Sequence, residues 1–317
     1  MIASANAHMA GSHPTGAFVS RPVTDRVAAE RLARLICSDN GLTEPELIRL
    51  SMTATFRSGS TVLRVGHFDG DLDGAVQLAE LLRAKGISAP RPLGVHQLDE
   101  SSGLAAVLYE FIEGNALPVD WRAVGVLAQR LHTEVSADMI PRGVPLVQPT
   151  SLPWWQFDEM LNDIEERELV EQSDVTMLRD VVQAAGEWRA IFDDAPLVVT
   201  HGDLHPGNIL MTPDGPVLVD WDLLAHAPTS WDHVPLAAWS GGPWLGAGHE
   251  YEQFVEGYGS VSADVERDIW QLATLRNVAA TLMRIRAGES SAAAAVEAQR
   301  RLEYWKQVEF YSLWRAV

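Results

Sequence analysis

The chain has 317 residues, of which 47% are apolar and 21% are charged, as expected for a folded globular protein. Its formal net charge of −19 argues against a nucleic-acid partner and against binding to an anionic membrane surface, because like charges repel. The same charge is compatible with a cationic small molecule, or it simply keeps the protein soluble. Cys37 is the single cysteine, which excludes an intramolecular disulfide and a cysteine-built zinc site.

Residues 1–20 are expected to form a flexible N-terminus. Their first part, MIASANAHMAGSHPTG, lacks the basic start and the apolar centre of a signal peptide. No apolar run in the chain is long enough to span a bilayer. We therefore expect a cytoplasmic protein that has no membrane partner.

Residues 21–113 are predicted to form an N-terminal nucleotide-binding lobe. Apolar residues recur at helical spacing over 23–38, and the alternation over 45–68 predicts three strands separated by a short loop and a tight turn. A helix is predicted over 74–86, and two further strands over 87–97 and 103–114. This order predicts a small, mostly antiparallel sheet with a helix packed on it.

Residues 114–317 have a different character and are predicted to form a helical lobe. Apolar residues near helical period occur over 119–134, 153–172, 175–192, 251–259 and 263–285, and the alanine run at 292–295 also suggests a helix. The strand-like segments here are 197–201, 208–211 and 217–221. The chain is thus predicted to be α+β and two-lobed, with the boundary near 113–115.

A polar loop in this second lobe is the strongest candidate for a functional site. Residues 200–210, THGDLHPGNIL, lie between two apolar runs, and loops of this kind often carry catalytic or binding residues. The turn signal Pro-Asp-Gly-Pro at 213–216 predicts a hairpin directly after the loop. Pairing Thr212 with Val217 would set the register of this hairpin.

In that register Ile209 faces Asp220, so Asn208 and Asp220 lie at the same open end of the hairpin. Asp203 is five residues before Asn208, on the loop that leads into it. An amide oxygen and a carboxylate suit Mg²⁺, which usually binds one or two carboxylates together with phosphates and waters. Asp203 would then be left to orient a hydroxyl, which is the division of roles that phosphoryl transfer needs.

The spacing of His201, Asp203 and Asn208 matches the protein-kinase catalytic loop, and Asp220 stands where the metal-binding aspartate follows. The wording HGDLHPGNIL followed by LVDWD resembles the aminoglycoside phosphotransferase and choline kinase-like families, which are small-molecule kinases with a protein-kinase-like fold. The resemblance implies that Asp203 is the catalytic base and that Asn208 and Asp220 bind Mg²⁺. It also implies a small antiparallel-sheet lobe and a large, mainly helical lobe.

The resemblance implies supporting roles for four more residues. Asp222 would be a nearby auxiliary acid, and Asp232 would brace the catalytic loop. His201 would pack or hydrogen-bond to hold the loop. For His205 two interpretations stay open, a contact to the substrate or a hydrogen bond to the loop backbone.

A nucleotide, ATP or GTP, is implied as the phosphate donor. Ser51 and Thr53, between the first two predicted strands, could donate hydrogen bonds to its phosphates. Arg64 occupies the position of the kinase strand lysine and would bind the same phosphates, since arginine presents two donors to an oxyanion. The acid that pairs with Arg64 stays open, because Ala75 stands at the expected helix position.

The strand at 103–114 would contact the nucleotide base. The family pattern places Tyr109 behind the base, with the Glu110 carbonyl and the Ile112 amide hydrogen-bonding to the purine. These backbone contacts do not distinguish ATP from GTP.

The predicted function is Mg²⁺-dependent transfer of the terminal phosphate of ATP or GTP to a hydroxyl of a small molecule. An antibiotic such as an aminoglycoside is the first candidate acceptor, and a cationic one could be held by the eight acids in 156–174, although a solvated acidic helix face is the more common explanation of such a pattern. Choline, a sugar, an amino alcohol or a macrolide remain alternatives. The three catalytic positions disfavour a nucleotide-binding pseudokinase, and the absence of a GNH sequence disfavours a dinuclear metallophosphoesterase.

Overall fold

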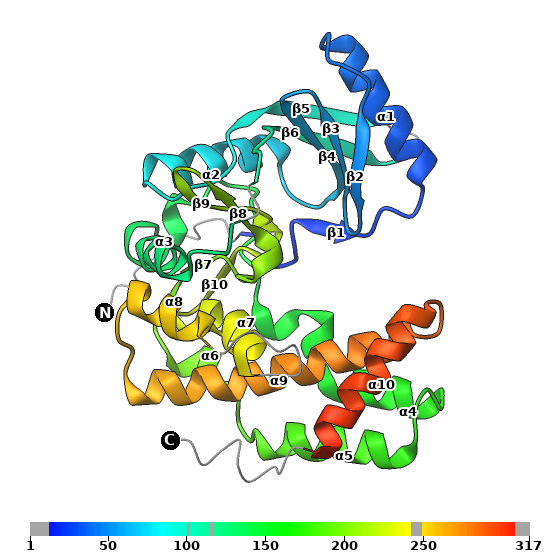
Figure 1. The fold of residues 1–317 in the computed structure, drawn as a ribbon, viewed down its shortest axis with the longest axis vertical. Helices are drawn as coiled ribbons and strands as arrows, with labels where there is room; N and C mark the ends of the chain where they lie inside the picture. Colours follow the sequence, from blue (N-terminus) through cyan, green and yellow to red (C-terminus); the bar gives the residue numbers. More distant parts are fainter. Residues whose placement is uncertain (1–12, 100–101, 115–116, 242–248, 308–317) are drawn as a thin grey trace, which may run out of the picture.

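The computed structural model describes residues 13–99, 102–114, 117–241 and 249–307. Figure 1 shows a β-sheet with two helices at one end of the molecule and most of the helices at the other end. The sheet part contains β1 (Val19–Arg21), α1 (Arg26–Asp39), β2 (Glu46–Leu50), β3 (Ala54–Ser58), β4 (Thr61–Phe68), α2 (Leu72–Ala84), β5 (Pro92–Asp99) and β6 (Leu104–Glu110).

The helical part begins with α3 (Trp121–Glu134), α4 (Phe157–Glu166), α5 (Gln172–Ala184) and α6 (Ala190–Asp194). Short strands follow: β7 (Leu197–Thr200), β8 (Ile209–Thr212), β9 (Gly215–Leu218) and β10 (Ala225–Pro228). The last helices are α7 (Ser230–Gly241), α8 (Glu250–Tyr258), α9 (Ala263–Ala287) and α10 (Ala292–Gln307). Short 3-10 turns occur at Ala137–Met139, Pro149–Ser151, Pro153–Trp155, Pro206–Asn208 and Trp221–Leu223.

The larger sheet has the strand order β2-β3-β4-β6-β5, and β1 pairs with β4. Its pairings are antiparallel, as the sequence predicts. Strand β1 is not predicted from the sequence, because three residues are too few to show alternation, and its first two residues lie in the segment 1–20 that is expected to be flexible. Since β6 ends at Glu110 and α3 begins at Trp121, we keep 21–113 and 114–317 as the proposed lobes.

Helix α1 covers one face of the sheet. Asp25 starts the helix, because its carboxylate accepts a hydrogen bond from the Ala28 amide at 2.9 Å. The buried side of α1 contacts the inward residues of β3, β4 and β6 in one apolar cluster, which includes Ile36, Phe56 and Leu63. The regular alternation of β3 and β4 thus follows from having this helix on one side.

Helix α2 belongs to a different core that continues into the helical part. Leu78 and Leu82 of α2 share a buried cluster with Ile209 and Leu218 of the β8–β9 hairpin and with residues of α3, α7 and α8. Figure 1 shows α2 directly beside β8 and β9. The hairpin is therefore fixed from both parts of the molecule.

The register of the β8–β9 hairpin differs from the predicted one. Thr212 pairs with Gly215 and Ile209 with Leu218, so the two central turn residues are Pro213 and Asp214. Gly215 has φ +114° and the Thr212 hydroxyl donates to its carbonyl at 2.9 Å, which explains the tighter turn. The prediction that paired Thr212 with Val217 is therefore wrong by two residues.

Helix α9 lies between two apolar clusters of the helical part. Ile269 and Ala273 belong to the cluster shared with α2, whereas Leu272, Leu275 and Val278 belong to a second cluster with α4, α5 and α10. Helix α7 was not predicted as a helix, because its side chains are buried over most of its length and Pro235 interrupts the pattern.

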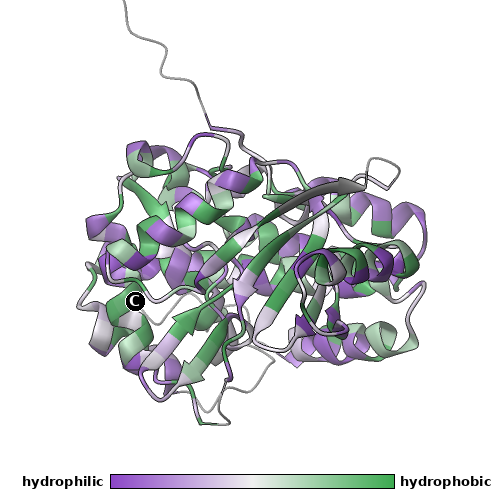
Figure 2. Ribbon diagram, turned by 90° about the horizontal axis from the view of Figure 1, so that it is seen from above, coloured by the Kyte–Doolittle hydropathy of each residue, from purple (hydrophilic) through white to green (hydrophobic). Residues whose placement is uncertain are grey.

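Two helices approach each other closely at glycines. A Cβ at Gly125 of α3 would overlap the carbonyl oxygen of Phe254 in α8, and a Cβ at Gly257 of α8 would overlap the carbonyl oxygen of Arg122. Figure 2 shows that the helices alternate hydrophilic and hydrophobic residues, as helices packed on a core do. Among the described helices, none is both long and apolar enough to cross a membrane.

Candidate functional site

The predicted catalytic loop follows β7 and turns sharply at Gly202. This residue has φ +83°, and a Cβ here would overlap the carbonyl oxygen of Leu223. The positive φ and the nearby carbonyl oxygen therefore both require glycine at this position. The loop then forms the short turn Pro206–Asn208 before β8 begins.

Asp232 of α7 holds the backbone of this loop. Its carboxylate accepts hydrogen bonds from the amide of His201 at 2.8 Å and from the amide of Gly202 at 2.7 Å. The side chain of His132 on α3 donates to it at 3.0 Å, and Tyr258 of α8 contacts the other ring nitrogen of His132 at 2.8 Å. Burial alone would raise the pKa of Asp232, but its donors hold the pKa below the ordinary value.

His201 is fully buried and faces the protein interior. Its Nε2 contacts the carbonyl of Val219 at 3.1 Å, and its ring lies 4.5 Å from the ring of Trp221, measured between centroids. Burial lowers the pKa of His201, so the ring is neutral at physiological pH. The loop-holding role that the sequence suggests for His201 stays a proposal, which these contacts support.

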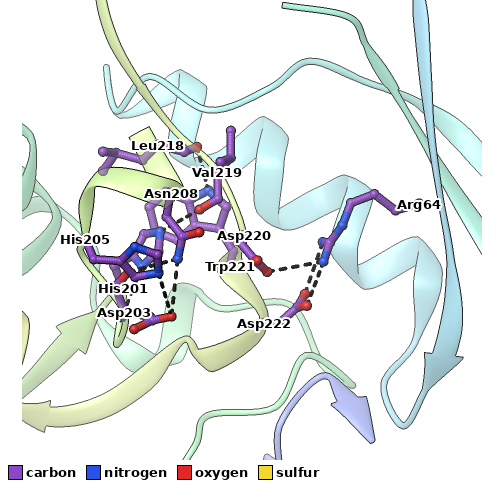
Figure 3. Close-up of polar contacts among 10 residues, drawn as sticks. All are labelled: Arg64, His201, Asp203, His205, Asn208, Leu218, Val219, Asp220, Trp221 and Asp222. Carbon is purple, nitrogen blue, oxygen red and sulfur yellow. Dashed lines mark hydrogen bonds and ion pairs between the residues drawn. The ribbon is translucent and has the colours of Figure 1, made fainter. Parts of the chain in front are cut away.

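Asp203 is contacted on both carboxylate oxygens, and Figure 3 shows the contacts of Oδ2. Oδ1 accepts a hydrogen bond from Arg276 of α9 at 2.5 Å. Oδ2 contacts Asn208 Nδ2 at 3.3 Å and His205 Nε2 at 3.4 Å. Burial would raise the pKa of Asp203, but Arg276 and His205 outweigh it and hold the pKa well below its usual range. The carboxylate is therefore ionised at neutral pH.

His205 makes the contact to the loop backbone, which is one of the two alternatives that the sequence left open, and it also contacts Asp203. The amide of Gly207 donates to His205 Nδ1 at 3.0 Å, which leaves Nε2 as the nitrogen that can donate. That nitrogen points at Asp203 Oδ2 (Figure 3). His205 thus satisfies loop backbone and steadies the carboxylate.

Asn208 and Asp220 lie next to each other at the open end of the hairpin (Figure 3). The amide of Val219 donates to the carbonyl of Asn208 at 3.0 Å, which extends the hairpin by one step and leaves Asp220 as the next residue. Asn208 Nδ2 also donates to the Asp203 carbonyl at 3.0 Å, so the amide oxygen of Asn208 is turned away from Asp203. Asp220 has a left-handed backbone with φ +66°.

This donor set fits a divalent cation that keeps other ligands. In the part of the chain that the structure describes, no group of three or more histidine, cysteine, aspartate or glutamate side chains could hold a metal ion. Asn208 and Asp220 instead offer one amide oxygen and one carboxylate beside a cavity. Mg²⁺ is bound in this manner when phosphates and waters complete its octahedron.

Arg64 of β4 pairs with acids of the helical part, which answers the question that the sequence left open. Its two Nη atoms contact Asp222 at 3.1 and 2.7 Å, and Nη2 also contacts Asp220 at 3.2 Å (Figure 3). Burial opposes the charge of Arg64, but the two carboxylates raise its pKa, so it stays protonated. Burial and the nearby Asp220 raise the pKa of Asp222 to about 6, although Arg64 opposes this.

A cavity of about 310 Å³ lies between the sheet, α2 and the base of the hairpin. Its lining includes the predicted nucleotide and metal residues Ser51, Thr53, Arg64, Glu110, Ile112, Asn208 and Asp220, together with Tyr109 and Asp222. Ala75 of α2 lines the same cavity and adds no charge. Asp203, His201, His205 and Asp232 are not part of this lining, and Asp203 is connected to it through Asn208.

Sequence reasoning missed Arg276 and His132. Both lie in stretches whose pattern predicts a helix and says nothing of a site. The direct pairing of Asp222 with Arg64 was also missed, because it joins positions 158 residues apart. A charged residue on the inner side of a predicted helix is the one signal that could have suggested Arg276.

Several of the acids in 156–174 are paired with basic residues of neighbouring helices. Asp163 contacts Arg286 at 3.1 Å, Glu165 contacts Arg179 at 2.7 Å, and Asp174 contacts Lys306 at 2.7 Å. None of the acids in this segment lines the 310 Å³ cavity. The hypothesis that this segment attracts a cation into the cleft therefore gains no support from the geometry.

Comparison with known proteins reveals a family and a fold. The model of a family described as "Phosphotransferase enzyme family", APH, matches residues 53–271. No curated protein sequence matches the chain.

Solved structures match over almost the whole chain. Spectinomycin phosphotransferase APH(9)-Ia in complex with ADP and spectinomycin has a TM-score of 0.63 and 16% identity, covering 90% of this chain and 97% of that one. Amicoumacin kinase hAmiN in complex with AMP-PNP, Ca²⁺ and Ami has a TM-score of 0.64 and 14% identity, covering 92% and 100%. A choline/ethanolamine kinase family protein from Mesorhizobium loti has a TM-score of 0.61 and 18% identity, covering 90% and 96%. These similarities confirm the predicted two-lobed, kinase-like α+β fold.

Proposed function

Since this chain belongs to the phosphotransferase enzyme family APH, we propose that it transfers the terminal phosphate of ATP or GTP to a hydroxyl group of a small molecule. One observation carries the proposal: Asn208 contacts Asp203 and also lines, with Asp220 and Arg64, the cavity between the sheet and the hairpin. A base, oxygen donors for a cation and a guanidinium are the groups that phosphoryl transfer requires.

The donor end of the reaction is assigned to residues that line the cavity. Asn208 and Asp220 would hold Mg²⁺, which when bound neutralises phosphate charge. Arg64 would exchange part of its contact with the carboxylates for the phosphates of the nucleotide. Ser51 and Thr53 would donate hydrogen bonds to the same phosphates.

The base of the nucleotide is assigned to the end of β6. The carbonyl of Glu110 and the amide of Ile112 would hydrogen-bond to the purine, and Tyr109 would pack behind it. Support comes from the position of all three residues in the cavity wall, where β6 leaves the sheet. Backbone groups of this kind fit adenine and guanine alike, so both ATP and GTP are proposed donors.

The acceptor end is assigned to Asp203. Its carboxylate would orient the hydroxyl and accept its proton as the oxygen attacks the terminal phosphorus. His205, His201 and Asp232 would hold the loop in the geometry that this step needs.

An antibiotic is the first acceptor class that we propose to test. Support comes from the printed ligands of structural neighbours, namely spectinomycin, amicoumacin and, for an aminoglycoside 2″-phosphotransferase, kanamycin. Choline, sugars, amino alcohols and macrolides form the comparison set. A mass gain of one phosphate on any of these alcohols, with ATP or GTP and Mg²⁺, identifies the acceptor.

The variant Asp203→Asn tests the mechanism. It keeps the shape of the side chain but removes the base, so transfer should fall by about 10²–10⁴-fold while nucleotide affinity is retained. Steady-state transfer rates and calorimetric binding of AMP-PNP would measure the two quantities. Transfer by the variant at the wild-type rate would refute the role of Asp203, and a wild-type protein that transfers phosphate to no acceptor would refute the proposed function.

A further inference from the structure

Arg276 holds one side of the proposed catalytic base. Its Nη2 donates to Asp203 Oδ1 at 2.5 Å, whereas the contacts of Oδ2 with Asn208 and His205 are 3.3 and 3.4 Å long. The side chains of Arg276 and Asp203 are 24% and 22% exposed, so the pair is only partly open to solvent. The two carboxylate oxygens therefore differ, because a short charge-assisted bond fixes Oδ1 and longer contacts surround Oδ2.

The helix that carries Arg276 is firmly packed. The residues on either side, Leu275 and Asn277, are 0% and 6% exposed. Asn277 also donates to the carbonyl of Ala238 in α7 at 3.3 Å, and α7 carries Asp232. The loop is thus held at its backbone by α7 and at its carboxylate by α9, two helices that pack on each other.

We infer that Arg276 is a positioning residue for the phosphate transfer, an inference that rests on the proposed function. Arg276 fixes Oδ1 of Asp203 and so sets the plane of the carboxylate, which presents Oδ2 to the acceptor hydroxyl. A carboxylate oxygen has two acceptor sites, and the contacts of Oδ2 with Asn208 and His205 are long, so the acceptor hydroxyl can take the place of one of them.

Arg276 supports an in-line transfer of the terminal phosphoryl group. The acceptor oxygen forms a bond to the terminal phosphorus, the bond from that phosphorus to the bridging oxygen breaks, and the nucleoside diphosphate leaves. The hydroxyl proton passes to Oδ2 of Asp203. Arg276 forms and breaks no covalent bond, and its contribution is to keep the attacking oxygen aligned.

Arg286, on the same helix, provides a matched control. It contacts Asp163 of α4 at 3.1 Å, so it also forms an ion pair between two elements. Neither Arg286 nor Asp163 contacts the catalytic loop in the described structure. Arg276→Met and Arg286→Met therefore remove the same group from the same helix, and they differ in whether Asp203 loses its partner.

The experiment compares Arg276→Met, Arg276→Lys and Arg286→Met in the full chain. The assay is transfer from MgATP to the alcohol that gains phosphate in the acceptor panel. Arg276→Met should lower kcat by on the order of 10²-fold, because a misplaced catalytic group has an effect of that size. The KM for ATP should differ from the wild-type value by less than about twofold. A difference of that size is the error within which the effects of distant sites add. Arg276→Lys should restore part of kcat, and Arg286→Met should keep the wild-type kcat.

A double variant tests whether Arg276 acts through Asp203. In the Asp203→Asn background, Arg276→Met should cause no further loss of kcat, because residues that act as a unit are not additive. A purely structural role would instead lower kcat again and would lower the urea midpoint of both Arg276→Met proteins.

The following outcomes also overturn the inference. A kcat of Arg276→Met close to that of an active wild type removes the positioning role and leaves the proposed function standing. Equal losses in Arg276→Met and Arg286→Met, or a matching loss of ATP affinity, assign the effect to the helix or to the nucleotide site. A wild type that transfers phosphate to no acceptor removes the proposed function and this inference together.

Discussion

Asp220 combines an unfavourable backbone with a proposed role in the reaction. Its φ of +66° is a conformation that side chains with a Cβ avoid, at a cost of roughly 1–2 kcal/mol for most residues and less for aspartate. It also lies beside Asp222, with which it shares Arg64. Strain and charge repulsion at one residue are a common sign that selection has favoured activity over stability.

The substitution Asp220→Gly should separate these two effects. Glycine adopts the left-handed conformation without strain, so the melting temperature should stay the same or rise. Metal-dependent transfer should fall by on the order of 10²-fold or more, because a metal ion supplies several kcal/mol of charge stabilisation. Calorimetry and the transfer assay measure the two effects, with Asp220→Asn as the control that keeps the side-chain shape. A large loss of stability in Asp220→Gly would show that the carboxylate stabilises the fold.

At the scale of single residues, the sequence predicted which residues lie close together in the site. It could not predict all of the contacts between them. Asn208 and Asp220 are neighbours because the hairpin between them is short and its turn is encoded locally. Arg64 and Asp222 meet across 158 positions, and Asp203 meets Arg276 across 73. Contacts of that kind depend on how the elements pack, and a single sequence carries no local signal for them.

At the scale of elements, helices α3 and α8 pack closely together, and their contact affects the site. Gly125 and Gly257 let the two helices touch at their backbones. This approach places His132 of α3 beside Tyr258 of α8, and His132 in turn contacts Asp232. The distance between the two helices thus affects the proposed catalytic loop through His132, which contacts both Tyr258 and Asp232.

The substitution Gly125→Ala should destabilise the protein. In most helix interiors this change stabilises by about 0.5–1 kcal/mol, but here the new methyl group would overlap the Phe254 carbonyl. Overpacking of this kind costs about 1–3 kcal/mol, so the net free energy of unfolding should fall. Urea unfolding measures it, with Gly16→Ala as a control because a Cβ there meets no atom within 4 Å. A stabilised Gly125→Ala protein would show that the helices separate without penalty.

The elements themselves were largely predictable, and the exceptions have physical causes. Strands β3 and β4 alternate because α1 covers one face, so their pattern is visible in the sequence. Helix α7 is buried over most of its length and contains Pro235, so it shows no amphipathic period. The predicted hairpin register was wrong because Pro213 and Asp214 form the turn. Gly215 and the hydrogen bond from the Thr212 hydroxyl together favour this turn.

Across the whole molecule, buried histidines link stability to pH. His233 of α7 is fully buried, its Nδ1 contacts the Tyr251 hydroxyl at 3.2 Å, and burial lowers its pKa to about 3. In the unfolded chain a histidine has a pKa of about 6.5. Between these values the unfolded chain binds a proton that the native protein does not, so stability is lost as pH falls from about 6.5 towards 3.

The substitution His233→Phe should make this dependence shallower. One proton corresponds to at most about 1.4 kcal/mol of unfolding free energy per pH unit, and the variant lacks that contribution. Urea midpoints measured from neutral to mildly acidic pH would show the reduced slope. His249→Phe, at a position 76% exposed, is the control for replacing a histidine at the surface. An unchanged slope in His233→Phe would assign the acid sensitivity to other groups.

The ion pairs of Arg64 join the sheet to the base of the hairpin, so the two halves of the molecule are already tied together before any ligand enters. A triphosphate arriving in the cavity would compete with Asp220 and Asp222 for the same guanidinium. Entry of the nucleotide and weakening of that connection would then be one exchange, and departure of the product would restore it. The free energy needed to separate the sheet from the hairpin would therefore change during each turnover, because it depends on the charge of the ligand in the cavity.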